Sequence, residues 1–198
     1  MNQIDLANDQ LRRMRGMTGY YHGRFFSDMR AVAVGVLALF VLGWSVAPEA
    51  FLLVPVVAIL GANQAAFDSS YLIFARHYAA ELESFLNRSV GGRVLVAAEM
   101  EDAYLFPLNL TKIVTIPLGG PGFSWFAWMT SLYTLLGALA AGAALALGWS
   151  TLTAAGGGWI VFYVGALGGL VATSLAIGWW WFLRGAGERK LRGVFETP

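Results

Sequence analysis

The sequence contains no cysteine, only two histidines and few charged residues. Without cysteine there is no disulfide, no thiolate nucleophile and no cysteine-ligated metal. His22 and His77 lie far apart in the sequence and outside any motif with metal-ligand spacing, so we predict no metal site. Charged residues make up 13% of the 198 residues, about half the share that is usual in a soluble domain. These absences exclude thiol chemistry and disfavour a soluble metalloenzyme.

Motifs of common nucleotide-binding and hydrolytic sites are also missing. The sequence has no GxxxxGK[ST], no GxSxG and no HExxH. The glycine-rich stretches "GGRV" and "GGPG" lack the strand–loop–helix context of a phosphate-binding loop. We therefore predict no cofactor and assign no catalytic residue from motifs.

Long apolar runs dominate what is present. Hydrophobic residues make up 58% of the chain, and the mean hydropathy is +0.61. A membrane-spanning helix needs about 20 mostly apolar residues. Four runs approach or exceed that length: 31–47, 50–67, 123–149 and 159–183. Only Pro48-Glu49 separates the first run from the second. The predicted fold is an all-α integral membrane protein with four transmembrane helices.

The basic residues indicate the orientation of these helices. All 13 lysines and arginines precede the first run, follow the fourth, or lie between the second and third. Because cytoplasmic loops are rich in Lys and Arg, we predict a multi-pass protein of the cytoplasmic (inner) membrane with both termini cytoplasmic. Five segments are predicted. They are a basic cytoplasmic arm (1–30), a first transmembrane hairpin (31–67), a cytoplasmic helix with an irregular segment (68–122), a second transmembrane hairpin (123–183) and a basic tail (184–198).

The second helix is predicted to extend well beyond the membrane. No glycine or proline separates its apolar run from a stretch with helical periodicity, so we expect one helix over about 50–87, ended by Gly91-Gly92. An apolar stripe follows one side of the cytoplasmic part: Tyr71, Phe74, Tyr78, Leu82 and Phe85. Arg76, His77 and Glu83 mostly occupy the other side. The stripe must be buried against this chain, a partner or the lipid surface. A short helix over about 95–104 and an extended or hairpin-like segment are expected next.

Polar residues near the end of the second apolar run allow two interpretations. Counted from the turn at Pro48, Arg30 and Asp68 lie at similar depth near the inner boundary, and we predict that they can pair. With Asn63 and Gln64 they could form an ion or proton site. The favoured alternative is an interfacial ion pair beside a polar helix–helix contact, because Asp68 is the one carboxylate there and lies at the edge.

Small residues on the last two runs predict close helix packing. Gly165 and Gly169 form a GxxxG motif, and Gly137 and Ala141 form a similar pair on the preceding run. We favour packing between the third and fourth helices of one chain over a subunit interface.

Three functions remain open at this stage. The leading hypothesis is a non-catalytic membrane subunit or scaffold that assembles with itself or a partner through the stripe. The alternative is a small oligomeric channel or transporter that uses Asn63, Gln64 and Asp68. The third is an enzyme acting on lipid through His77, Glu81 and the acidic residues Glu99, Glu101 and Asp102. The predicted partners are the lipid bilayer, a homo-oligomer or membrane-protein complex, and anionic lipid headgroups, but not nucleic acid.

Overall fold

The computed structural model describes residues 3–105, 107–108, 113 and 125–196, and every regular element in these residues is helical. Four of the helices are long and apolar enough to cross a membrane. The predictions of an all-α chain and of four membrane-length helices are therefore confirmed. The extended or hairpin-like segment that we expected after Tyr104 falls largely outside the described residues.

Helix α1 (Gln3–Ser45) is one uninterrupted helix. The basic arm predicted at 1–30 is thus the first part of the helix that carries the first apolar run. Gly16, Gly19 and Gly23 do not interrupt it, although each glycine costs about 1 kcal/mol of helix stability relative to alanine. The apolar side chains of Ala7 and Leu11 are buried against α2, and this tertiary packing keeps the arm helical.

The second membrane-length helix begins with a 3-10 turn, η1 (Pro48–Leu53), and continues as α2 (Val54–Ser89). The prediction of one long helix over about 50–87 is confirmed. The helix ends where Gly91 adopts a φ of 69°, and the amide of Gly92 donates to the carbonyl of Asn87 (3.2 Å). Glycine at this position closes the helix because a left-handed backbone has no Cβ penalty there.

The remaining helices are α3 (Ala97–Tyr104), α4 (Trp125–Ala154), α5 (Gly157–Gly178) and α6 (Ala186–Glu196), with a π-helical turn, η3 (Trp179–Leu183), after α5. The predicted short helix near 95–104 is α3. The connection between α4 and α5 is shorter than the gap between the apolar runs 123–149 and 159–183, because α4 extends to Ala154 and α5 begins at Gly157. Gly156, with a φ of 103°, turns the chain. The tail expected at 184–198 contains α6.

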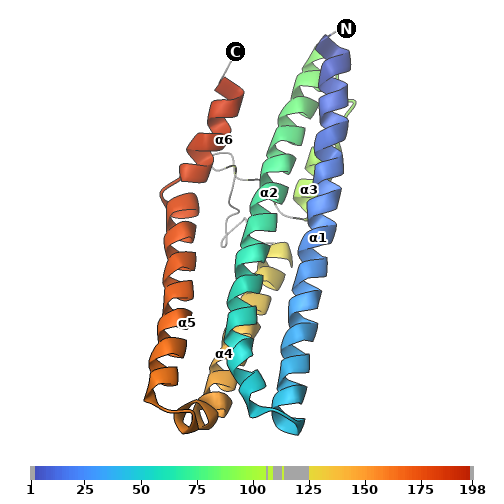
Figure 1. Cartoon of the computed structure of the whole chain (residues 1–198). Helices are drawn as coiled ribbons and strands as arrows, with labels where there is room; N and C mark the ends of the chain where they lie inside the picture. Colours follow the sequence, from blue (N-terminus) through green and yellow to red (C-terminus); the bar gives the residue numbers. More distant parts are fainter. Residues whose placement is uncertain (1–2, 106, 109–112, 114–124, 197–198) are drawn as a thin grey trace. The chain divides into compact units, whose positions relative to one another are not determined.

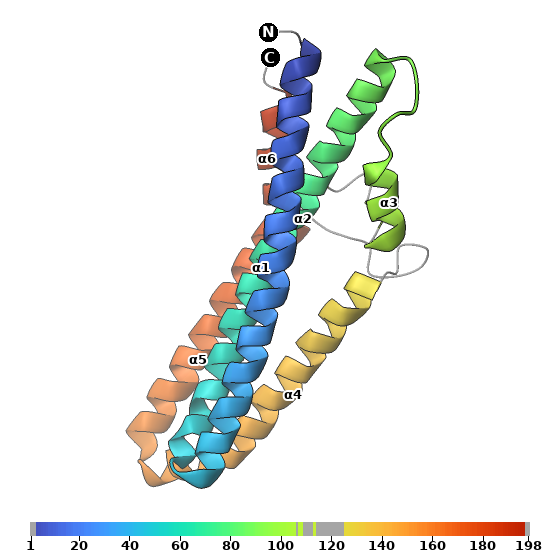
Figure 2. The ribbon, with the colours of Figure 1, turned by 90° about the vertical axis from the view of Figure 1, so that its right-hand side faces the viewer.

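The chain divides into two compact units. The first comprises Met1–Phe25, Phe67–Thr130 and Gly187–Pro198, and the second comprises Phe26–Ala66 and Ser131–Ala186. In both units α1 and α2 run side by side in opposite directions (Figures 1 and 2). The first unit holds α3 and α6, and the second holds most of α4 and all of α5.

Close helix contacts define the packing of the second unit. Phe51, Val54 and Ala144 are buried together, with Val36 and Phe40 against them. Gly61 permits one approach of α2 to α1, since a Cβ there would lie 2.6 Å from a methyl carbon of Val32. These contacts bring α1, α2 and α4 together.

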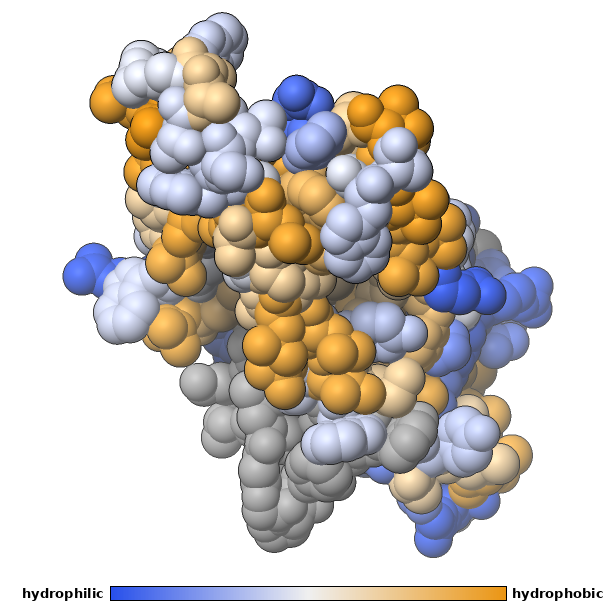
Figure 3. Space-filling view, turned by 90° about the horizontal axis from the view of Figure 1, so that it is seen from below, coloured by the Kyte–Doolittle hydropathy of each residue, from blue (hydrophilic) through white to orange (hydrophobic). Residues whose placement is uncertain are grey.

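Most of the apolar surface of the second unit remains exposed within the chain. No residue of α5 is fully buried, and Val161 and Leu175 are 75% and 68% exposed. The end of the molecule that carries the short turns is covered largely by apolar side chains (Figure 3). So much exposed apolar surface is expected where lipid, rather than water, surrounds the helices.

Candidate functional site

The most prominent polar feature is a partly buried cluster of charged side chains in the first unit. It lies on the side of α2 opposite the predicted apolar stripe. Arg76 is 1% exposed and Glu83 is 4% exposed, so this polar side is an inter-helix face. We call Arg15, Arg76, Glu83, Glu101 and Asp102 the ion-pair cluster. Buried charges of this kind are stable only when they are paired and hydrogen-bonded.

Arg15 of α1 joins α2 to α3. Its Nη2 lies 2.5 Å from Oε2 of Glu83 on α2, and its Nη1 lies 2.5 Å from Oε1 of Glu101 on α3. The guanidinium is planar and carries several donors, so one side chain can bind two carboxylates in fixed directions. Arg15 therefore connects three helices through two ion pairs.

Arg76 forms a second connection between α2 and α3. Its Nε donates to Oε2 of Glu101 (3.1 Å), and its Nη2 donates to Oδ1 of Asp102 (2.8 Å). Glu101 therefore bridges the two arginines, with one oxygen on Arg15 and the other on Arg76. Burial raises the pKa of Asp102, and the neighbouring Arg76 charge opposes that rise.

Glu83 also caps the start of α3. Both of its carboxylate oxygens accept from the backbone amide of Ala98 (3.2 Å each), which lies in the first turn of α3. The residue at the N-cap position, Val96, provides no side-chain hydrogen bond. A carboxylate at this end of a helix satisfies an otherwise unpaired amide and interacts favourably with the helix dipole.

The loop before α3 is held by Asn87 of α2. The Asn87 Nδ2 donates to the carbonyl of Leu95 (2.8 Å), and its Oδ1 accepts from the amides of Val94 (3.0 Å) and Leu95 (2.8 Å). Leu95 also packs against the apolar cluster of α1 and α2. Since no residue of α3 is itself buried, the segment is held mainly by polar contacts.

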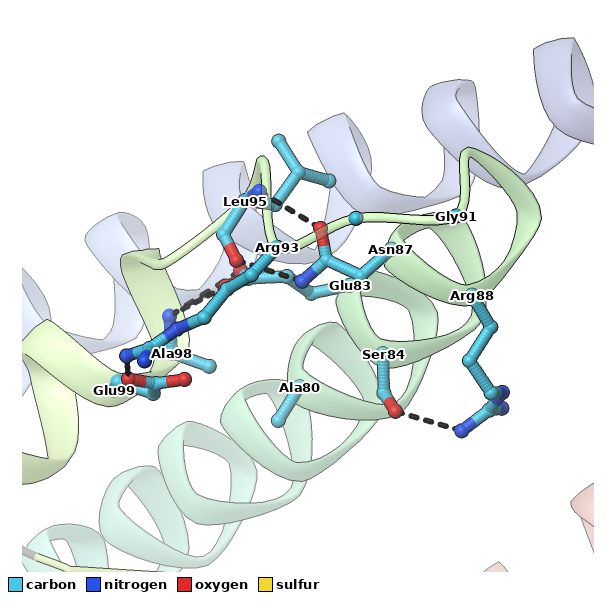
Figure 4. Close-up of a pocket in the computed structure, with 11 residues that line it drawn as sticks. Ala80, Glu83, Ser84, Asn87, Arg88, Gly91, Arg93, Leu95, Ala98 and Glu99 are labelled. Carbon is cyan, nitrogen blue, oxygen red and sulfur yellow. Dashed lines mark hydrogen bonds and ion pairs between the residues drawn. The ribbon is translucent and has the colours of Figure 1, made fainter.

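A pocket of about 450 Å³ lies beside this loop. Figure 4 shows its walls: Arg93 points to Glu99 on one side, and Arg88 donates to Ser84 (2.8 Å) on the other. The two guanidinium groups point in different directions. The pocket therefore lacks a pair of convergent cations for a single small anion.

The positions of the predicted polar residues give a mixed result. The ion pair recorded for Asp68 is with Arg24, whose Nε lies 3.5 Å from Oδ1. The Nε of Arg30 instead donates to the carbonyl of Phe26 on its own helix (3.2 Å). The prediction counted residues from Pro48 as the centre of the turn. However, α1 ends at Ser45 and η1 already begins at Pro48, so the true centre of the turn lies before Pro48. Asp68 thus forms an ion pair with Arg24, and its pairing with Arg30 stays a prediction.

Asn63 takes part in a polar contact between helices of the second unit. Its Nδ2 donates to Oγ of Ser174 on α5 (2.8 Å), and that hydroxyl donates to the carbonyl of Leu170. Tyr163 of α5 similarly donates to the carbonyl of Leu52 (2.7 Å). Gln64 is half-buried in the same unit. Asn63 therefore has the packing role that we considered for it, while an ion site remains a prediction.

The apolar stripe is shared between internal and exposed positions. Tyr71 stacks on Tyr21 of α1, with 5.1 Å between ring centroids, and Leu82 packs against the apolar cluster of α1 and α2. Phe74 and Tyr78 are half-buried, while Phe85 is 37% exposed. Only part of the predicted stripe is therefore available to a partner.

Of the small residues predicted for close packing, Gly165 and Gly169 are exposed, and Gly137 and Ala141 are half-buried. A Cβ added at Gly137, Gly165 or Gly169 would meet no atom within 4 Å. The half-buried side of α5 instead carries Tyr163 and Ser174. Packing of the third and fourth helices through these glycines therefore receives no support from the structure.

The acid–base pair considered for an enzyme is not arranged as a reactive site. His77 is buried, whereas Glu81 is exposed, and Glu101 and Asp102 bind arginines. The described residues contain no group of three or more His, Cys, Asp or Glu side chains that could hold a metal ion.

Comparison with protein-family models, curated proteins and solved structures finds no match for this chain.

Proposed function

We propose that this chain is a non-catalytic, multi-pass membrane subunit that assembles with itself or with a partner protein through its first unit. One observation carries this proposal: the charged side chains of the ion-pair cluster bind one another, and so join α1, α2 and α3. Arginine does not exchange protons near neutral pH, so a cluster built on two arginines is suited to holding helices rather than to acid–base catalysis.

The proposed contact surface consists of exposed apolar side chains on α2 and α3. Phe85 is 37% exposed, Met100 is 66% exposed and Tyr104 is 86% exposed. Aromatic residues and methionine are enriched at protein interfaces. The ion-pair cluster fixes α3 on the side of α2 opposite the stripe, so Met100 and Tyr104 add exposed apolar side chains there, and Phe85 is the exposed residue of the stripe itself. These exposed side chains replace the complete stripe as the proposed contacts, because Tyr71 and Leu82 have contacts inside the unit.

The native mass in lipid nanodiscs tests this proposal. Phe85→Glu and Met100→Glu should each reduce the assembled mass or remove a co-purifying protein. Leu6→Glu is the matched control, since Leu6 is an exposed apolar residue of α1 in the same unit (49% exposed). A monomeric parent protein with no co-purifying partner would contradict the proposal, as would equal behaviour of all three variants.

We assign both termini and the first unit to the cytoplasmic side of the inner membrane. The distribution of lysine and arginine supports this orientation. The absence of cysteine allows a direct test, because a single introduced cysteine has no background. In intact cells a membrane-impermeant maleimide should label Thr153→Cys, near the turn after α4, but not Asn8→Cys on α1. The reverse labelling pattern would contradict the assignment.

A small channel or transporter is the second candidate. Its support is Asn63, an exposed amide on a membrane-length helix, since polar groups in lipid often mark a transport path. Flux through proteoliposomes should then fall in Asn63→Leu. Unchanged flux would leave Asn63 with only its packing contact to Ser174.

A further inference from the structure

Helix α3 is attached to the first unit mainly through charge. No residue of α3 is buried, and its larger apolar side chains, Met100 and Tyr104, are exposed. The hydrophobic effect scales with the apolar area removed from water, so apolar burial contributes little to this attachment. The carboxylate of Glu101 on α3 instead binds both Arg15 of α1 and Arg76 of α2.

The ion pairs of α3 are within reach of dissolved salt. The side chains of Glu101 and Asp102 are 25% and 42% exposed, although that of Arg76 is buried. In the three pairs that join α3 to α1 and α2, the N–O distances lie between 2.5 and 3.1 Å. The Debye length is about 10 Å at 0.1 M salt and about 3 Å at 1 M. Only the higher concentration therefore screens charges that are in direct contact.

The packing of α1 on α2 depends on a different interaction. Ala7, Leu11, Ala79 and Leu86 form a buried apolar cluster between these two helices. Apolar contacts carry no charge that salt could screen, so the cluster persists at a salt concentration that weakens the ion pairs. The first unit therefore combines a salt-sensitive attachment of α3 with a salt-resistant pair of helices, α1 and α2.

The connection between α2 and α3 keeps a released α3 near its binding site. Gly91 and Gly92 lie in this connection, and a Cβ at either position would meet no atom within 4 Å. Asn87 binds the backbone of Val94 and Leu95, just before α3 begins. These hydrogen bonds join neutral groups and are not screened as ion pairs are. A released α3 thus stays tethered and rebinds when the salt concentration falls.

We propose that α3 is an ionic latch, a helix that its ion pairs with Arg15 and Arg76 hold in place at low salt and that a rise in ionic strength releases. This inference rests on the proposed function, because Met100 and Tyr104 belong to the proposed contact surface and are held at defined positions only while α3 is attached. Ionic strength therefore regulates the assembly of the first unit, and dissolved salt itself is the regulator.

Hydrogen exchange of the full chain in phosphatidylcholine nanodiscs, at 0.1 M and 1 M potassium chloride, tests the latch. Protection of the α3 amides should fall about 2- to 10-fold at the higher concentration, as expected when screening removes about half of the contribution of three partly exposed pairs. Protection of α2 amides in the apolar cluster, around Ala79, should stay unchanged. An equal loss in the cluster would overturn the proposal, because salt would then act on the whole unit.

Two variants show whether the ion pairs cause the salt response. Glu101→Gln should have low α3 protection at both concentrations, because the pairs that salt screens are already broken. Glu99→Gln is the matched control, since it removes the same charge from α3, but from an exposed pair with Arg93 outside the cluster. It should keep the salt response of the parent chain. Undiminished α3 protection of the parent chain at 1 M would overturn the proposal, as would equal salt responses of all three chains.

Sedimentation of the same nanodiscs separates this proposal from the proposed function. A smaller assembled mass at 1 M than at 0.1 M would support regulation of assembly by the latch. An unchanged assembled mass, with α3 protection lost, would overturn that regulation. A monomer at both concentrations would contradict the proposed function, whereas salt-dependent protection of α3 in that monomer would still support the latch.

Discussion

Replacement of Glu101 by glutamine should release α3 from the first unit. Glu101 bridges Arg15 and Arg76 with one oxygen each. Glutamine keeps the size of the side chain but has one acceptor oxygen and an NH₂ group. One arginine would then face a donor instead of an acceptor. The substitution therefore removes a charge and leaves a buried guanidinium poorly paired, with little change in volume.

The size of the effect follows from burial. Removal of one partner from a fully buried ion pair costs about 3–5 kcal/mol, whereas exposed pairs contribute about 0.2–1 kcal/mol. The side chains of Arg76, Arg15 and Glu101 are 0%, 23% and 25% exposed. An intermediate cost of about 2–3 kcal/mol is therefore expected. At 1.36 kcal/mol per factor of ten, this cost corresponds to a change of about 30- to 150-fold in the equilibrium constant for attachment of α3.

Hydrogen exchange of the α3 amides measures this cost directly. A helix as short as α3, Ala97–Tyr104, is not stable alone, so its protection reports its attachment to α1 and α2. Protection should fall about 30- to 150-fold in Glu101→Gln. The control Glu81→Gln, an exposed carboxylate of α2, should change it less than about twofold. Undiminished protection in Glu101→Gln would refute the conclusion that ion pairs hold α3.

Three further outcomes are expected. Gly61→Ala should destabilise the α1–α2 hairpin by about 1–3 kcal/mol in a steric-trapping assay, because its Cβ meets a stiff β-branched valine, whereas Gly35→Ala, in open space, should not. A double-mutant cycle of Asn63→Leu and Ser174→Ala should give a coupling of about 0.6 kcal/mol. Asp102→Asn should cost little at neutral pH, since burial raises the pKa of Asp102. Because the folded chain binds this proton more tightly than the unfolded chain, protonation of Asp102 stabilises the fold. This contribution to stability is fully present below pH 3.8 and is lost as the pH rises through the folded-state pKa of Asp102. In hydrogen exchange of α3, the variant should lose stability relative to the parent as pH falls.

The helices themselves could be predicted from the sequence. Apolar runs of membrane length and the lack of a break after Phe67 were sufficient to identify the four long helices and the extension of α2. The helical arm of α1 was harder to predict because Gly16, Gly19 and Gly23 lower local helix propensity. Packing of Leu11 against α2 outweighs this local cost.

The ion-pair cluster could not be predicted in the same way. Arg15 lies 68 residues from Glu83 and 86 residues from Glu101, and no local pattern indicates such distant partners. The periodicity of α2 also gave an incomplete account of its burial. None of the five stripe residues is fully buried, whereas Leu72, Ala79 and Leu86, outside the stripe, are buried, and Arg76 on the opposite side is more buried than Phe85.

Both results have one physical cause, which is that α2 has neighbours on two sides in the first unit. Its apolar side contacts α1 through Tyr71 and Leu82, while Arg76 on its polar side binds α3. Amphipathicity predicts an inner and an outer face only when one side of a helix meets water. When a second helix covers the polar side, charged residues become buried and must find opposite charges. The acidic sequence of α3 provides them, so its attachment depends on charge rather than on apolar burial.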